Sequence, residues 1–81
     1  ADLARRLARS GDLETAVELY RRALAARFNQ VDWRLALIDV LTRLERYEEA
    51  HHEARICLRV RPQSDAARKR FETLSRKLPV E

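Results

Sequence analysis

The sequence predicts an all-α protein built from short antiparallel helical hairpins. Apolar residues recur every three or four positions along almost the whole chain, which is the spacing of one helix face. One glycine and two prolines among 81 residues are too few for the turns of an all-β fold, and no segment alternates with a period of two. Helix-breaking residues divide the chain into five helical segments: 2–10, 13–27, 31–44, 47–60 and 64–78. Loops of two to four residues make successive helices antiparallel.

The first two segments each carry one apolar face. Leu3 and Leu7 lie one helical turn apart in the first segment, so we expect both on its buried side. Asp12 is the expected N-cap of the second segment, because its carboxylate can accept a hydrogen bond from an unpaired backbone N–H. The apolar stripe of the second segment consists of Leu13, Ala16, Val17, Tyr20, Ala23 and Leu24.

The third segment is apolar around most of its circumference, so we expect it between neighbours at the centre of the domain. Pro62 ends the fourth segment and disfavours a helical conformation at Arg61. Ser64 is the expected N-cap of the fifth segment, and Asp65 in its first turn favours the helix dipole. We expect the fifth segment to bury Phe71, Leu74 and Leu78.

The formal net charge of +4 belongs to the last third of the chain. Residues 1–50 contain nine arginines and nine acidic residues, whereas residues 51–81 contain eight basic and four acidic residues. A basic surface can bind acidic peptides, nucleic acid or anionic lipid, and it is also typical of a solvated helix face. The charge therefore indicates a class of partner only if the basic residues line one groove.

Composition excludes several classes of protein. The single cysteine, Cys57, cannot form an internal disulfide framework, and no apolar run approaches the ~20 residues that span a bilayer. No signal segment is present in these residues, so we expect a soluble domain of unspecified compartment. Since the sequence does not begin with methionine, we expect a fragment of a longer chain. The abundance of arginine over lysine and of alanine is typical of a bacterial source.

The residues that could support chemistry do not form a site at the sequence level. His51 and His52 are adjacent, so on a helix they diverge by ~100° and cannot bind one metal ion together. Cys57 falls on an apolar face, where we expect a buried residue rather than a nucleophile. One glycine cannot form a phosphate-binding loop. We therefore predict no catalytic, metal or cofactor site and no enzyme activity.

An internal repeat appears when the chain is shifted by 34 residues. Leu13 then aligns with Tyr47, Ala16 with Ala50, and the third segment aligns with the first. Residues 11–24 and 45–58 look like two copies of the second-helix signature of the tetratricopeptide repeat, and Pro62 falls at the family's proline. The chain departs from the family pattern at Phe28, where proline is usual. In the first-helix motif only Leu37 matches, with Trp33 one residue early.

The resemblance implies a right-handed α–α superhelix of about two and a half repeats in a single domain, 1–81. Repeat one would span about 1–30 and repeat two 31–64, and a capping helix would span 65–78. Phe28 and Trp33 flank the turn between the repeats. We expect them to form a hydrophobic contact across that joint, and the alternative is a half-exposed anchor for a partner.

The resemblance also implies a non-enzymatic scaffold that binds a peptide or partner protein in a concave groove. The first helix of each hairpin lines that groove, and seven of its expected residues are basic while two are acidic: Arg5, Arg9, Asp32, Leu35, Asp39, Arg43, Lys69, Arg70, Thr73, Arg76 and Lys77. Arginine binds carboxylates with two parallel hydrogen bonds, so an acidic segment is the expected ligand. The carboxylate clamp of some family members is matched only at Arg70.

Two other functions are compatible with the sequence. The basic C-terminal third could bind nucleic acid, although it lacks the interleaved aromatic residues on which bases stack. The N-terminal hairpin, which has no cap, could instead mediate self-association.

Overall fold

The structure is a computed structural model that describes residues 2–78. It contains five α-helices: α1 (Asp2–Ser10), α2 (Leu13–Ala26), α3 (Val31–Arg43), α4 (Tyr47–Val60) and α5 (Asp65–Lys77). No strand occurs within the described range. The all-α prediction is confirmed, and each helix ends within one residue of the predicted segment.

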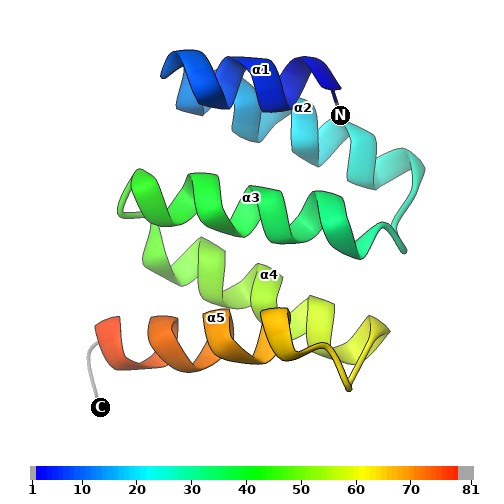
Figure 1. Ribbon diagram of the computed structural model, residues 1–81, viewed down its shortest axis with the longest axis vertical. Coiled ribbons are helices and arrows are strands. Elements are labelled where there is room, and N and C mark those ends of the chain that lie inside the picture. The colour runs from blue at the N-terminus through cyan, green and yellow to red at the C-terminus, as the bar shows by residue number, and fades with distance from the viewer. Residues whose placement is uncertain (1, 79–81) are drawn as a thin grey trace.

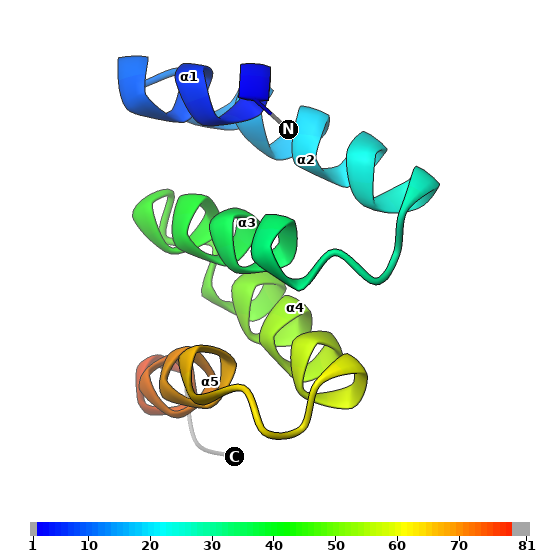
Figure 2. The same ribbon diagram turned by 45° about the vertical axis from the view of Figure 1, so that its right-hand side comes forward.

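The helices form a stack about 35 Å long in which each helix packs against the next in sequence. α1, α3 and α5 lie on one side of the stack, and α2 and α4 lie on the other (Figures 1 and 2). We call these sides the odd-helix face and the even-helix face. α3 contacts α5 as well as α2 and α4, which confirms its predicted central position. No helix among residues 2–78 has the length and apolar character needed to cross a membrane.

The two tight turns on the stack repeat one geometry 34 residues apart. After α1, Asp12 N donates to Leu7 O at 2.9 Å, and after α3, Arg46 N donates to Leu41 O at 2.9 Å. This hydrogen bond over five residues requires a left-handed residue just before the donor. Gly11 fills that position at φ 94°, whereas Glu45 adopts φ 59° in the second copy. The second turn therefore places a side chain in a conformation that favours glycine.

The other two connections also match each other. Arg27 and Arg61, which follow α2 and α4, have almost the same backbone angles, with φ −137° and ψ 84° against φ −141° and ψ 86°. Pro62 ends α4 as predicted. Ser64 caps α5 by accepting a hydrogen bond from Ala67 N at 3.2 Å. Asp12 occupies the predicted N-cap position of α2, but the predicted hydrogen bond to its carboxylate is not formed.

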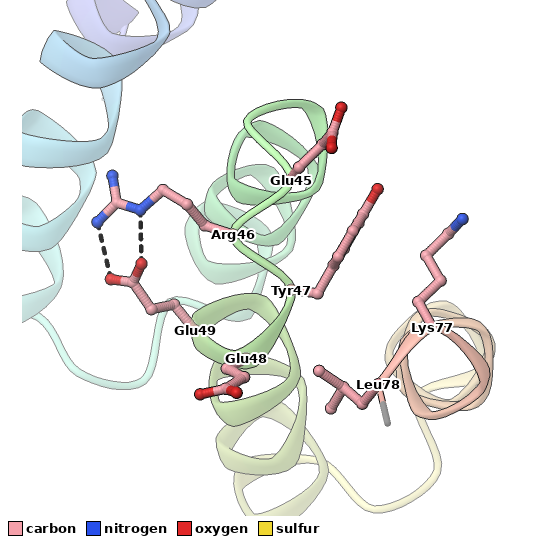
Figure 3. A pocket seen from close by; sticks show the side chains of 7 residues that line it. All are labelled: Glu45, Arg46, Tyr47, Glu48, Glu49, Lys77 and Leu78. Carbon is pink, nitrogen blue, oxygen red and sulfur yellow. Dashed lines mark hydrogen bonds and ion pairs between the residues drawn. The ribbon is translucent and has the colours of Figure 1, made fainter. Parts of the chain in front are cut away.

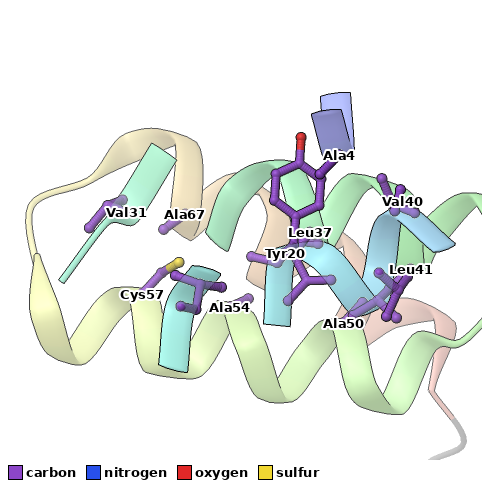
Figure 4. Packing of buried hydrophobic residues seen from close by; sticks show 14 of the residues in the cluster. Ala4, Tyr20, Val31, Leu37, Val40, Leu41, Ala50, Ala54, Cys57 and Ala67 are labelled. Atoms are coloured by element: carbon purple, nitrogen blue, oxygen red, sulfur yellow. The ribbon is translucent and has the colours of Figure 1, made fainter. Parts of the chain in front are cut away.

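The core runs through the stack as one cluster centred on α3 (Figure 4). Leu37, Ile38 and Leu41 are fully buried, and they pack against small residues of the even helices. Ala16, Ala50, Ala54 and Cys57 are also fully buried. Small side chains at these positions allow close approach of neighbouring helices, and a larger side chain would push the helices apart.

Burial at the two ends of the stack differs in part from the prediction. Leu3 is 58% exposed, and Ala4 takes its place as the buried residue of α1, because α2 covers only one side of that helix. On α5, Leu74 is buried as predicted, whereas Phe71 and Leu78 are only half-buried.

Candidate functional site

A pocket of about 220 Å³ lies between α3 and α5 on the odd-helix face. It is lined by Asp39, Thr42, Lys69, Arg70, Thr73 and Leu74, so four of the groove residues expected from the sequence meet in one depression. Leu74 supplies an apolar contact, while lysine, threonine and charged groups surround it. This arrangement can hold a side chain and hydrogen-bond the groups next to it.

An ion pair links the two helices beside this pocket. Arg70 Nε donates to Asp39 Oδ1 at 2.8 Å, and its Nη2 donates to Oδ2 at 3.0 Å. Arg70 Nη1 donates to Ala66 O at 3.1 Å. The hydrogen bonds to Asp39 raise the pKa of Arg70. Asp39 thus neutralises Arg70 at the protein surface, and Lys69 carries the remaining positive charge of the pocket.

The other predicted groove residues are spread along the odd helices. Arg43 donates to Ala8 O at 3.3 Å and so joins α3 to the end of α1. Leu35 is half-buried against the core. Three further basic residues are exposed: Arg5 and Arg9 on α1 and Arg76 on α5.

Asp32 and Lys77 lie away from the pocket at Asp39. Asp32 lines a separate pocket of about 190 Å³ at the α2–α3 loop, together with Arg61. The ammonium of Lys77 lies 5.4 Å from the centroid of the Tyr47 ring (Figure 3). Lys77 therefore faces the start of α4.

The pocket at Lys77 has a volume of about 380 Å³ and lies between the start of α4 and the end of α5 (Figure 3). Arg46 forms two hydrogen bonds with the Glu49 carboxylate. These hydrogen bonds lower the pKa of Glu49. The lining residues are Glu45, Arg46, Tyr47, Glu48, Glu49, Lys77 and Leu78.

Sequence reasoning missed a buried ion network between the even helices and α3. Arg34 and Glu53 are each only 5% exposed, and Arg34 Nη1 donates to Glu53 Oε1. Arg21 on α2 contacts Glu53 at 3.5 Å and Glu49 at 3.1 Å. A sequence signal existed: Arg34 occurs three residues before Leu37, and Glu53 lies between Ala50 and Ala54, so both occupy core positions of their helices.

The two aromatic residues at the α2–α3 turn have different environments. Trp33 is half-buried and packs against the core, but Phe28 does not join it there, so the expected burial of both residues at the joint is wrong for Phe28. Phe28 is 56% exposed, and the Arg34 guanidinium lies over its ring at 4.7 Å. Arg34 Nη2 also donates to Phe28 O at 3.2 Å. Phe28 is thus an exposed aromatic residue in contact with the buried network.

The histidines and the cysteine have structural surroundings. His51 stacks on Phe71 with 4.5 Å between ring centroids, and its Nε2 lies 2.9 Å from Ser75 Oγ. Burial, with a smaller contribution from Arg55, lowers the pKa of His51. Burial raises the pKa of the Cys57 thiol to about 11. Within residues 2–78, no group of three or more histidine, cysteine or carboxylate side chains could hold a metal ion.

Comparison with known proteins agrees with the geometry. No curated protein matches the chain significantly. The sequence model of the tetratricopeptide repeat matches residues 7–78, which include the C-terminal part of α1 and the whole of α2 to α5. Since the match covers most of the chain, and the structure shows five helices stacked as hairpins, the protein belongs to the tetratricopeptide repeat family.

Proposed function

We propose that the protein is a non-enzymatic protein–protein interaction module that binds an acidic segment of its partner on the odd-helix face. Tetratricopeptide repeats are generally protein–protein interaction modules. The observation that carries the finer proposal is the pocket between α3 and α5, with Lys69 and Arg70 beside an apolar floor at Leu74. In this proposal, residues 1–30 and 31–64 are two repeats, and residues 65–78 cap the stack.

The Asp39–Arg70 pair gives the proposed site a specific electrostatic property. A carboxylate of the ligand that approaches Arg70 competes with Asp39 for the same two N–H groups. Removing the charge of Asp39 would free Arg70 for the ligand and remove the repulsion between two carboxylates. The proposal therefore predicts tighter binding of acidic peptides after Asp39→Asn.

The test is a titration of the protein with a fluorescein-labelled glutamate-rich peptide, followed by anisotropy. We expect Lys69→Gln and Arg76→Gln each to weaken binding about twofold to fivefold, and Asp39→Asn to strengthen it by a similar factor. Arg22→Gln is the matched control, because Arg22 is an exposed arginine on the even helix α2. Equal effects of Arg22→Gln and Lys69→Gln would mean that net charge alone attracts the peptide.

A parallel titration with duplex and single-stranded DNA over a salt series separates the alternative ligand. Binding of DNA at physiological salt that exceeds peptide binding, with a steep salt dependence, would refute the peptide proposal. Light scattering over a concentration series reports self-association, and we expect it to give a monomer throughout.

A further inference from the structure

Phe28 occupies the position at which the second repeat copy has Pro62. A comparison of the two turns shows which of their features do not depend on the phenyl ring. In both copies an arginine six residues later donates its Nη2 to the carbonyl at this position, Arg34 to Phe28 O and Arg68 to Pro62 O, each at 3.2 Å. The preceding residues, Arg27 and Arg61, have nearly identical backbone angles. Both copies of the turn thus share their backbone angles and an arginine hydrogen bond, and the phenyl ring is not required for either.

The Phe28 ring is nevertheless held in place although it is exposed. Arg34 lies over it at 4.7 Å, and Arg34 itself is 5% exposed and bound to Glu53. An aromatic residue with a fixed position and an open face loses little side-chain entropy when a partner packs on it. Such residues frequently contribute much of the binding energy of an interface.

The surface next to Phe28 is a groove of two adjoining parts between α2 and α4. One part, of about 220 Å³, is lined by Leu24, Ala25 and Phe28 above the buried network. The other, of about 310 Å³, is lined by Glu48, Glu49 and His52. Both parts share Arg21 and Glu53 and so form one groove, with Phe28 at one end and Glu48 at the other.

The acidic end of the groove has further carboxylates around it. Glu14 and Glu18 on α2 are close enough to Arg46 to raise its pKa, after the larger effect of its hydrogen bond to Glu49. The even-helix face is therefore acidic around the start of α4, although the chain as a whole has a net charge of +4. Glu49 and Glu53 are paired with arginines, but the carboxylates at this end outnumber those arginines, which favours a ligand with positive charge.

From this arrangement we propose that the groove between α2 and α4 is a second docking surface, which accepts a basic peptide segment with one large apolar side chain. The apolar side chain would pack on the open face of Phe28, and a lysine or arginine side chain would lie beside Glu48. This surface lies on the face opposite to the odd-helix pocket, and it selects the opposite charge. The inference therefore does not depend on the proposed function.

The experiment records amide chemical shifts of the isotope-labelled protein during titration with a short helical peptide of lysine, alanine and one tryptophan. We expect the shifts to concentrate at Leu24, Ala25, Phe28 and His52. Phe28→Pro should weaken binding about tenfold or more, and Glu48→Gln about twofold. Glu72→Gln, which removes an exposed carboxylate of α5, should leave binding unchanged.

Three comparisons make the test decisive. Phe28→Pro introduces the residue that the second copy has at this position, so circular dichroism should show an intact helical fold. Phe28→Leu retains an apolar side chain and should bind the peptide with an intermediate affinity. Peptides with alanine for tryptophan, or glutamate for lysine, should not bind. An unchanged affinity of Phe28→Pro, or no binding to the original protein, would overturn the proposal.

Self-association is a separate outcome. If sedimentation shows a dimer in the original protein and a monomer in Phe28→Pro, the groove is occupied by a second copy of the chain. That result would overturn the proposal of a basic peptide segment as the ligand. Binding of the glutamate-rich peptide to the odd-helix face should be the same in Phe28→Pro and in the original protein. Failure of this inference is therefore distinguishable from failure of the proposed function.

Discussion

Replacement of Glu53 by leucine tests the role of the buried ion network. The residue equivalent to Glu53 in the first repeat copy, 34 positions earlier, is Leu19. A leucine side chain therefore suits this position of an even helix. The substitution removes the carboxylate that Arg34 and Arg21 contact, and it leaves Arg34, only 5% exposed, without its acidic partner. Arg34 retains its hydrogen bond to Phe28 O and its position over the ring.

The magnitude follows from the burial of the pair. Removing one member of a buried ion pair destabilises proteins by about 3–5 kcal/mol, since the other charge stays buried and unpaired. A domain of this length has a free energy of unfolding of about 4–12 kcal/mol. We therefore expect Glu53→Leu to lower the free energy of unfolding by about 3 kcal/mol, and the Tm by roughly 12–24 °C. Replacing both members by apolar residues is commonly neutral or stabilising.

The assay is urea denaturation followed by circular dichroism for the original protein, Glu53→Leu, Arg34→Met and the double variant. The double variant should lie within about 1 kcal/mol of the original protein, which gives a coupling energy of more than about 2 kcal/mol. A loss of less than 1 kcal/mol in Glu53→Leu, or additive losses in the double variant, would refute the reasoning that this pair is energetically buried.

Three further predictions concern the turns and the titratable groups. Glu45→Gly should raise the free energy of unfolding by about 1 kcal/mol because φ is 59° there, and Gly11→Ala should lower it by a similar amount at φ 94°; chemical denaturation measures both. Because burial lowers the pKa of His51, the unfolded chain binds this proton more readily, so stability should fall as pH drops below about 6.5; His51→Gln should flatten this pH dependence in denaturation curves. With its pKa raised to about 11, Cys57 should react with a thiol reagent about a hundredfold more slowly in the native than in the urea-unfolded protein, and equal rates would contradict its burial.

The helices were predictable because their signals are local. Apolar spacing, the proline at Pro62 and the cap at Ser64 each depend on a few neighbouring residues, and the structure places the helix ends accordingly. The exposure of Leu3 was not predictable in the same way. Its spacing to Leu7 is correct for a buried face, but burial depends on which side of α1 the next helix covers.

The site was less predictable because its charged side chains form ion pairs with residues of other helices. The register of the repeat placed Asp39 and Arg70 on the same face, but it did not reveal that they neutralise each other. The burial of Arg34 and Glu53 depends on the same kind of long-range pairing, since neither residue alone would be stable at a core position. Phe28 was visible as a departure from the repeat pattern and, with Trp33, as a residue beside the α2–α3 turn, but whether the ring is buried or exposed depends on the packing around that turn.

The stacking order of the helices also determines how the protein folds. The extensive helix contacts join neighbours in sequence, and the smaller contact of α3 with α5 spans a single hairpin, so most contacts close only short loops. Such a low contact order is typical of chains that fold within microseconds to milliseconds. α3 packs against three other helices, whereas α1 packs extensively only against α2, so amide hydrogen exchange should be slowest in α3 and fastest in α1. The stack would therefore open from its N-terminal end first, while α3 and α4 hold the remaining structure together.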